Sequence, residues 1–94
     1  MNIDVEFIGI SRILSGVSKV CIVIPTKGTY RDVILELANK FPQFIGQLID
    51  PSQKAFIGSS MFNIDGKRMI KTEELDNSPE EHEHLIVMSI MAGG

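Results

Sequence analysis

The sequence has one cysteine, few basic residues and no apolar run of membrane-spanning length. The single cysteine, Cys21, has no partner for an internal disulfide, which is typical of a reducing compartment. The opening residues lack the basic and apolar regions of a signal peptide, and no segment reaches the ~18 to 20 apolar residues of a membrane helix. These absences predict a cytoplasmic protein that does not associate with membranes.

Basic side chains are also scarce, nine against twelve acidic ones, and the formal net charge is −3. A negative protein has no general attraction for a phosphate backbone. The densest basic patch, Lys67-Arg68 with Lys71, is too small to outweigh that charge. We therefore expect no nucleic-acid partner.

Motifs of independent catalysis are missing as well. The sequence contains no glycine-rich phosphate loop, P-loop or serine-hydrolase elbow. Cys21 lies between two apolar residues of a predicted strand with no histidine near it in sequence, so it is interpreted as a buried structural residue. We expect no catalytic residue in this chain and no bound cofactor.

What is present fits one soluble domain over residues 1–94, with a tail from about residue 91. The chain has 94 residues, of which 44% are apolar and 22% charged. Alternating apolar residues predict a strand over Asn2 to Ile10 and a second one over Lys19 to Ile24, joined by a connection from Ser11 to Ser18. Thr29 caps a predicted helix that extends to Phe41.

The second half of the chain is richer in turns. A short helical turn is expected around Phe44 to Ile49, and then a strand over Ala55 to Ile64. Asp65-Gly66 is a strong hairpin signal that returns the chain through Lys67 to Ile70. A polar acidic loop is expected from Lys71 to His84.

The last predicted strand, Leu85 to Met91, is apolar at nearly every position, which is typical of a central and often parallel strand. If Ser89 marks the outer face, then Ile86, Met88 and Ile90 point into the core. The other face is then predicted to be an apolar surface for a partner, formed by Leu85, Val87 and Met91.

Two histidines precede this strand, His82 and His84, with glutamates around them. Residues two apart point the same way on a strand, so these imidazoles are candidates for a shared metal. No third ligand is fixed nearby, and we favour a solvated acidic turn without metal.

The sequence closes with Ala92, Gly93 and Gly94. Glycine loses much backbone entropy on ordering, so this pair is not expected to stabilise the domain, but it suits a channel too narrow for a β-carbon. From a strand that ends near Ile90, four residues reach roughly 13 Å. We expect these three residues to fit the active site of another protein, with Gly94 as the residue that is modified.

The order strand, strand, helix, strand, short strand, strand predicts an α+β fold of the β-grasp type. We expect a mixed sheet of four or five strands with one main helix on one face. The chain then resembles the ubiquitin-like sulfur carriers, the family of the molybdopterin synthase small subunit and the thiamine sulfur carrier. The matching segments are Val5 to Ile8, Arg12 to Gly16, Thr29 to Phe41, Phe62 to Gly66 and Gly93-Gly94.

The resemblance implies a carrier and not an enzyme. An adenylating enzyme of the ubiquitin-activating type would join Gly94 to AMP, using ATP and magnesium that it binds itself. A sulfur donor protein would then supply the nucleophile that gives a thiocarboxylate, and a large synthase subunit is a further possible partner. Sulfur acceptors in such schemes are molybdopterin, a thiazole, a tRNA base or an amino acid.

Two alternatives remain open at this point. The carrier would instead be a protein modifier if Gly94 is joined to a lysine. A non-catalytic β-grasp interaction module, with an incidental Gly-Gly, would act through the apolar face described above.

Overall fold

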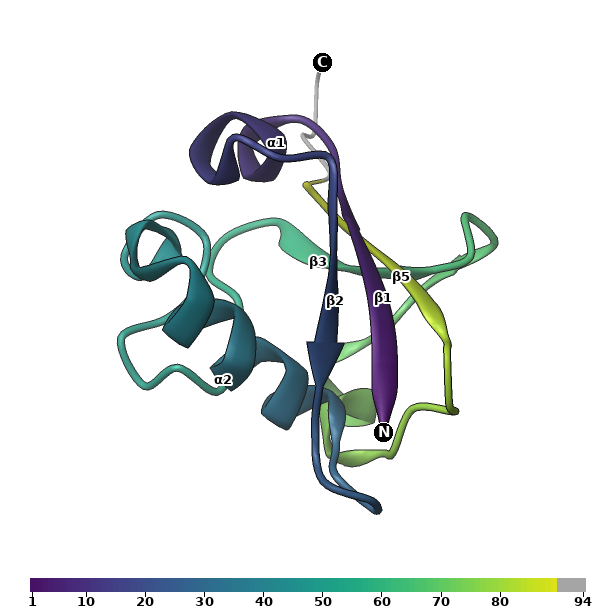
Figure 1. Cartoon of the computed structure of the whole chain (residues 1–94). Coiled ribbons are helices and arrows are strands. Elements are labelled where there is room, and N and C mark those ends of the chain that lie inside the picture. Colours follow the sequence, from purple (N-terminus) through teal and green to yellow (C-terminus); the bar gives the residue numbers. More distant parts are fainter. Residues whose placement is uncertain (90–94) are drawn as a thin grey trace.

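Five strands form one mixed sheet in the computed structural model, which describes residues 1–89 (Figure 1). The strands are β1 (Asn2–Phe7), β2 (Lys19–Val23), β3 (Ser60–Ile64), β4 (Arg68–Met69) and β5 (His84–Ser89). Their order across the sheet is β2-β1-β5-β3-β4, and β5 is parallel to β1 and antiparallel to β3. The predicted fold class is confirmed, with the last strand central and beside the first.

The main helix, α2 (Tyr30–Lys40), crosses one face of this sheet (Figure 1). It begins where the sequence predicts, because Thr29 and Asp32 form a capping box. The Thr29 backbone N–H donates to Asp32 Oδ2 at 2.8 Å. The apolar side of the helix is buried and consists of Tyr30, Val33, Ile34, Leu37 and Ala38.

The core lies between α2 and the inner face of the sheet. Successive side chains of a strand point to opposite faces, so Ile3, Val5 and Phe7 of β1 are all buried there. The ring of Phe7 meets the ring of Phe44 edge-on at 5.5 Å between centroids. Phe44 is the last residue of the 3-10 helix η1 (Pro42–Phe44), so the helical turn lies earlier than predicted, and residues 46–48 form a turn that is not helical.

The face prediction for β5 is wrong. The parallel register pairs Val5 with Leu85 and Phe7 with Val87, so these two β5 residues share the core face of β1. Leu85 is 0% exposed and Val87 is 1% exposed, and neither forms the apolar surface expected of them. Ile86 and Met88, predicted as core, lie half-buried on the outer face. Ile90 and Met91 lie outside the described residues.

Two predicted loops contain short helices. A helix, α1 (Ile10–Ser15), occupies the connection between β1 and β2, and a 3-10 helix, η2 (Thr72–Asp76), lies in the acidic segment before β5. Strand β3 is shorter than predicted, since it begins only at Ser60. The hairpin is confirmed: Asp65 and Gly66 both have positive φ, 55° and 74°, as a type I′ turn requires.

Among residues 1–89, no helix is long and apolar enough to cross a membrane.

Candidate functional site

The end of β5 pairs with β3, because the pairing with β1 stops at Val87. Met88 pairs with Met61 of β3, and Ser89 pairs with Ser60, whose hydroxyl lies 3.0 Å from the Ser89 hydroxyl. The chain is thus central in the sheet up to Val87 and paired with β3 up to Ser89. The predicted tail residues Ala92, Gly93 and Gly94 lie outside the described residues, as does Met91 of the predicted interface.

The start of β5 is fixed by α2. The Tyr30 hydroxyl donates to Glu83 Oε1, and the Tyr30 backbone N–H donates to the Asn77 carbonyl at 3.0 Å. Burial raises the pKa of Tyr30 above its usual value, and the hydrogen bond to Glu83 adds to the rise. The phenol is therefore neutral at ordinary pH and remains a donor that holds the residue preceding β5.

The helix α1 lies against the end of β5 (Figure 1). The Ser11 hydroxyl is 3.0 Å from the Val87 carbonyl and 2.9 Å from the Ile8 carbonyl, and the side chain is buried. The chain enters the helix through Gly9, whose φ of 62° and ψ of −132° suit glycine and strain any other residue. The Leu14 carbonyl also accepts a hydrogen bond from Gln43 Nε2 at 3.0 Å.

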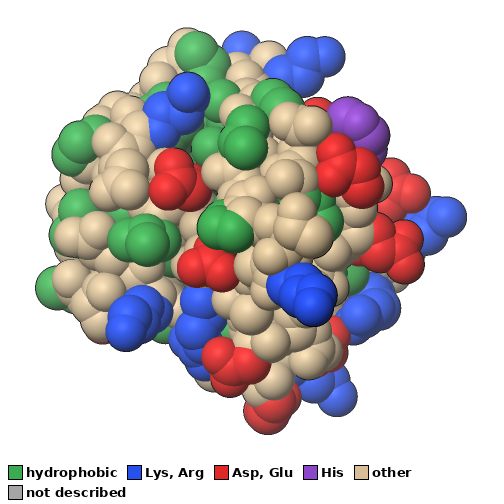
Figure 2. All heavy atoms as spheres, turned by 60° about the horizontal axis from the view of Figure 1, so that its bottom comes forward, with side chains coloured by type: hydrophobic (Ala, Val, Ile, Leu, Met, Phe, Trp, Pro, Cys, Tyr) green, Lys and Arg blue, Asp and Glu red, His purple; other side chains and the backbone are tan. Residues whose placement is uncertain are grey.

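Exposed apolar side chains gather on and around α1. Of the six large apolar residues that are most exposed among residues 1–89, four lie between residues 8 and 17. We call them the α1 surface, and they are Ile8, Ile10, Ile13 and Val17. Figure 2 shows mainly the opposite end of the molecule, where apolar side chains are interspersed with acidic and basic ones.

The sequence prediction missed this surface, because it assigned Ser11 to Ser18 to a connection. A signal was present in the spacing of Ile10, Ile13 and Leu14, which fits one face of a helix. Six residues are too few for that pattern to stand out, and isolated helices of this length do not form in water. Tertiary contacts stabilise the helix instead: Ser11 bonds to the Val87 carbonyl of β5, and Leu14 packs against the core.

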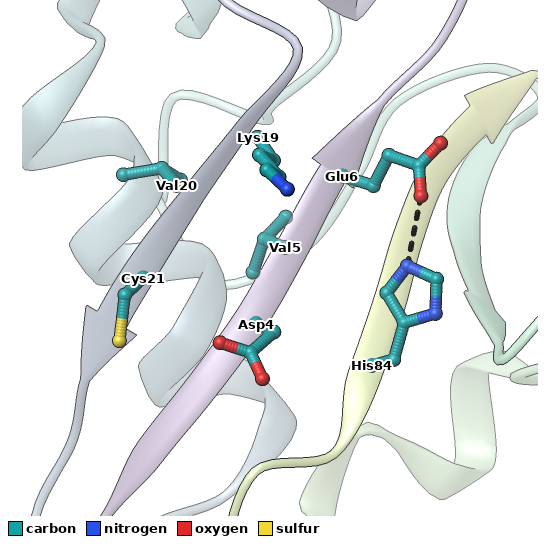
Figure 3. A pocket seen from close by; sticks show the side chains of 7 residues that line it. All are labelled: Asp4, Val5, Glu6, Lys19, Val20, Cys21 and His84. Atoms are coloured by element: carbon teal, nitrogen blue, oxygen red, sulfur yellow. Dashed lines mark hydrogen bonds and ion pairs between the residues drawn. The ribbon is translucent and has the colours of Figure 1, made fainter.

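The outer face of the sheet carries a shallow hollow with charged side chains from three strands (Figure 3). Its lining is Asp4, Val5, Glu6, Lys19, Val20, Cys21 and His84. His84 lies between two carboxylates: Nε2 is 2.9 Å from Glu6 Oε1 and Nδ1 is 3.2 Å from Asp65 Oδ1. The bond to Asp65, with that to Glu6, raises the pKa of His84.

The histidines do not form the metal site considered from their spacing. His84 is the first residue of β5, but His82 precedes the strand with a φ of 60°. The two side chains therefore do not share a strand face. No group of three or more potential metal ligands is found among residues 1–89.

Cys21 is exposed, so its interpretation as a buried residue is wrong. The antiparallel register sets Cys21 opposite Asp4, which places it on the outer face of the edge strand β2. Its Sγ lies 3.9 Å from the Asn2 side-chain oxygen, which is no base. Within residues 1–89 the thiol has no hydrogen bond to a basic side chain.

Comparison with solved structures finds similar proteins, whereas comparison of the sequence with family models and curated proteins finds none. SAMP1 from Haloferax volcanii has a similar structure, with a TM-score of 0.81 at 12% identity and full coverage of both chains. The fold is the ubiquitin-like β-grasp.

Two further solved structures are similar. A putative molybdopterin converting factor, subunit 1, from Pyrococcus furiosus has a TM-score of 0.72 at 19% identity, covering 96% of this chain and 98% of that one. Urm1 from Trypanosoma brucei has a TM-score of 0.65 at 14% identity, covering 99% and 95%. At such identities the likeness establishes the fold, which confirms the resemblance drawn from the sequence at that level.

Proposed function

We propose that this chain is a ubiquitin-like carrier whose Gly94 carboxylate is activated by an adenylating enzyme and converted to a thiocarboxylate. The observation that carries the proposal is the placement of the glycine pair: β5, the central strand of a β-grasp sheet, ends at Ser89, five residues before Gly94. A rigid strand that leads into two glycines is suited to presenting a terminal acyl group to another active site. The chain itself acts as co-substrate and not as enzyme.

The chemistry follows from the poor reactivity of a carboxylate. A Gly94 carboxylate oxygen attacks the α-phosphorus of ATP, pyrophosphate leaves, and the acyl group becomes a mixed anhydride with AMP. Hydrosulfide from the sulfur donor then attacks the carbonyl carbon, the bond to the phosphate oxygen breaks and AMP leaves. Loss of the thioacid proton gives the thiocarboxylate. ATP, magnesium and the sulfur source belong to partner proteins, which include an adenylating enzyme of the ubiquitin-activating type and a sulfur donor. Ala92 and Gly93 complete the segment that enters the enzyme.

A protein modifier is the second candidate, and the similarity to solved structures of SAMP1 supports it equally. The abbreviation SAMP1 stands for small archaeal modifier protein 1. In this case a lysine amine attacks the carbonyl carbon of the activated Gly94, AMP leaves, the nitrogen loses a proton, and an isopeptide bond forms. Both candidates need the same first step, since each begins with an activated Gly94.

The first test is intact mass spectrometry of the protein isolated from its own cell. A fraction that ends at Gly94 with one oxygen replaced by sulfur supports the carrier, and a Gly94 isopeptide on a lysine supports the modifier. A chain without either product, or one that continues unprocessed beyond Gly94, contradicts activation and favours an interaction module with an incidental Gly-Gly.

The second test uses purified protein and the adenylating enzyme from the same cell. ATP–pyrophosphate exchange should depend on this chain and should disappear when Gly94 is deleted, because the acyl group no longer reaches the nucleotide. The matched control is Gln47→Ala, an exposed position beyond η1, which should leave exchange unchanged. Undiminished exchange after deletion of Gly94 would reject the proposed activation.

A further inference from the structure

We propose that the α1 surface is where the adenylating enzyme docks on this chain, and that the enzyme offers it an apolar groove with an acidic group for Arg12. The inference deepens the proposed function and rests on it. In this inference the enzyme recognises the chain through Ile8, Ile10, Ile13 and Val17, whereas the residue that reacts is Gly94.

The reach of the tail restricts where such an enzyme sits. Residues 90–94 span at most about 17 Å when fully extended, at ~3.4 Å per residue. An enzyme that holds Gly94 at its nucleotide therefore covers the surface around Ser89. The Ser11 hydroxyl bonds to the Val87 carbonyl at 3.0 Å, and Val87 is only two residues before Ser89. The helix α1 thus lies well inside the covered region.

The exposed isoleucines of α1 make this helix the most apolar part of the region that the enzyme would cover. Ile13 is 78% exposed and Ile10 is 53% exposed, far more than the half-buried Ile86 and Met88 on the outer sheet face. Clustered apolar side chains that water contacts are typical of interaction sites, whereas single ones are ordinary. A partner gains the most from covering the side chains with the most surface left to bury.

The helix also keeps its shape without a partner. It is fixed by Ser11 to β5 and, through the Leu14 carbonyl, by Gln43 to the segment after α2. A surface that is already ordered loses little entropy on binding. Because these anchors use a buried hydroxyl and a backbone carbonyl, the isoleucine side chains are left to the solvent.

Charge supplies the second part of the recognition. Arg12 lies between the isoleucines in sequence, is exposed, and forms no ion pair with any residue from 1 to 89. A guanidinium at the edge of an apolar contact favours a carboxylate on the partner, in bidentate geometry. The expected occupant is therefore an apolar groove with an acidic rim.

The experiment is ATP–pyrophosphate exchange by the purified adenylating enzyme of the same cell, with the concentration of this chain varied. The double variant Ile10→Ser with Ile13→Ser should raise the KM for the chain about tenfold or more with kcat nearly unchanged. The control is Val23→Ser with Leu35→Ser, which removes two exposed apolar residues away from α1 and should change KM less than about twofold. Arg12→Glu should raise KM by a smaller factor.

The outcomes separate the two proposals. Loss of exchange on deletion of Gly94 together with an unchanged KM for the α1 variant would overturn the docking inference and leave the proposed function intact. Exchange that survives deletion of Gly94, or no exchange with the wild-type chain, would overturn both. Because Ile13 is largely exposed, the single variant Ile13→Ser keeps the test valid if the double variant unfolds, and a thermal melt checks both.

Discussion

Leu85 and Ile86 are adjacent apolar residues of one strand, and the sheet uses them differently. Leu85 points into the core and is fully buried, whereas Ile86 lies half-buried on the outer face opposite Glu6 and Asn63. The inner face is apolar around Leu85 and Val87, and the outer face mixes methionines with an amide, an imidazole and carboxylates. The comparison teaches that stability is concentrated on one face of β5, which leaves the other face and the strand end available for recognition.

The largest effect expected from this contrast is on folding stability. Leu85→Ala should lower the free energy of unfolding by about 2 to 5 kcal/mol, because it leaves a cavity in a close-packed core. Ile86→Ala removes a similar volume from a half-exposed site and should cost about 1 kcal/mol or less. Urea unfolding of both variants measures the difference, and equal losses would break the distinction between the two faces.

A smaller effect is expected at Asn63, the buried amide of the outer face. Its Nδ2 donates to Met69 Sδ at 3.0 Å, but Oδ1 is buried without a hydrogen-bond partner among residues 1–89. An unsatisfied buried acceptor costs about 1 to 3 kcal/mol. Asn63→Leu should therefore raise the free energy of unfolding by about 1 kcal/mol, measured by urea unfolding.

The control for this variant is Asn39→Leu, at an exposed position of α2, which should change stability by less than about 0.5 kcal/mol. A loss of stability in Asn63→Leu would mean that the amide makes interactions worth more than its desolvation. The outer face would then depend on polar contacts as much as the inner face depends on apolar ones.

The sequence was sufficient where structure is decided locally. Helix α2 has a cap at Thr29, an acid at Asp32 and an apolar stripe, so all signals agree and its bounds are nearly correct. The hairpin at Asp65-Gly66 is likewise decided by two residues that tolerate positive φ. The order of elements then left few topologies, and the central parallel strand followed from its composition.

The sequence was insufficient where the pairing of strands determines which way a side chain points. The faces of β5 follow from its register with β1, and a segment that is apolar at nearly every position has no alternation to reveal them. Ser89 is polar although it lies on the same strand face as Leu85 and Val87, and its polarity misled the assignment. The prediction that Cys21 is buried was wrong for the same reason, because the outward direction of its side chain follows from the pairing of Cys21 with Asp4.

The two parts of the candidate site, the glycine pair and the α1 surface, also differ in whether local sequence reveals them. The glycine pair is a local motif that the sequence displays directly, although Gly93 and Gly94 lie outside the described residues. The α1 surface depends on the hydrogen bond from Ser11 to the Val87 carbonyl, 76 residues away, and the local spacing of Ile10, Ile13 and Leu14 was too short a pattern to predict it. The isoleucines could be recognised as a candidate docking surface only once the structure showed that they are exposed and that α1 contacts the end of β5.

The smallest effect concerns His84, which ties the outer face of β1 to the turn after β3. Its pKa is raised, most by the hydrogen bond with Asp65 and then by that with Glu6. Because the folded pKa lies above the unfolded value of about 6.5, the stabilisation is complete below that pH and is lost as pH rises through the folded pKa. The side chain is 38% exposed, and water screening limits the contribution to ~0.5 kcal/mol.

His84→Gln should therefore lose this part of the pH dependence of unfolding while the rest of the profile is kept. The pKa of His84, followed by NMR titration, should fall most in Asp65→Asn and less in Glu6→Gln. Asp4→Asn is the matched control, since Asp4 pairs with His84 across the strands but makes no hydrogen bond to its ring. An unchanged pKa in Asp65→Asn would show that the outer face gains nothing from this bridge, and the two faces of the sheet would then differ even more sharply in what holds them together.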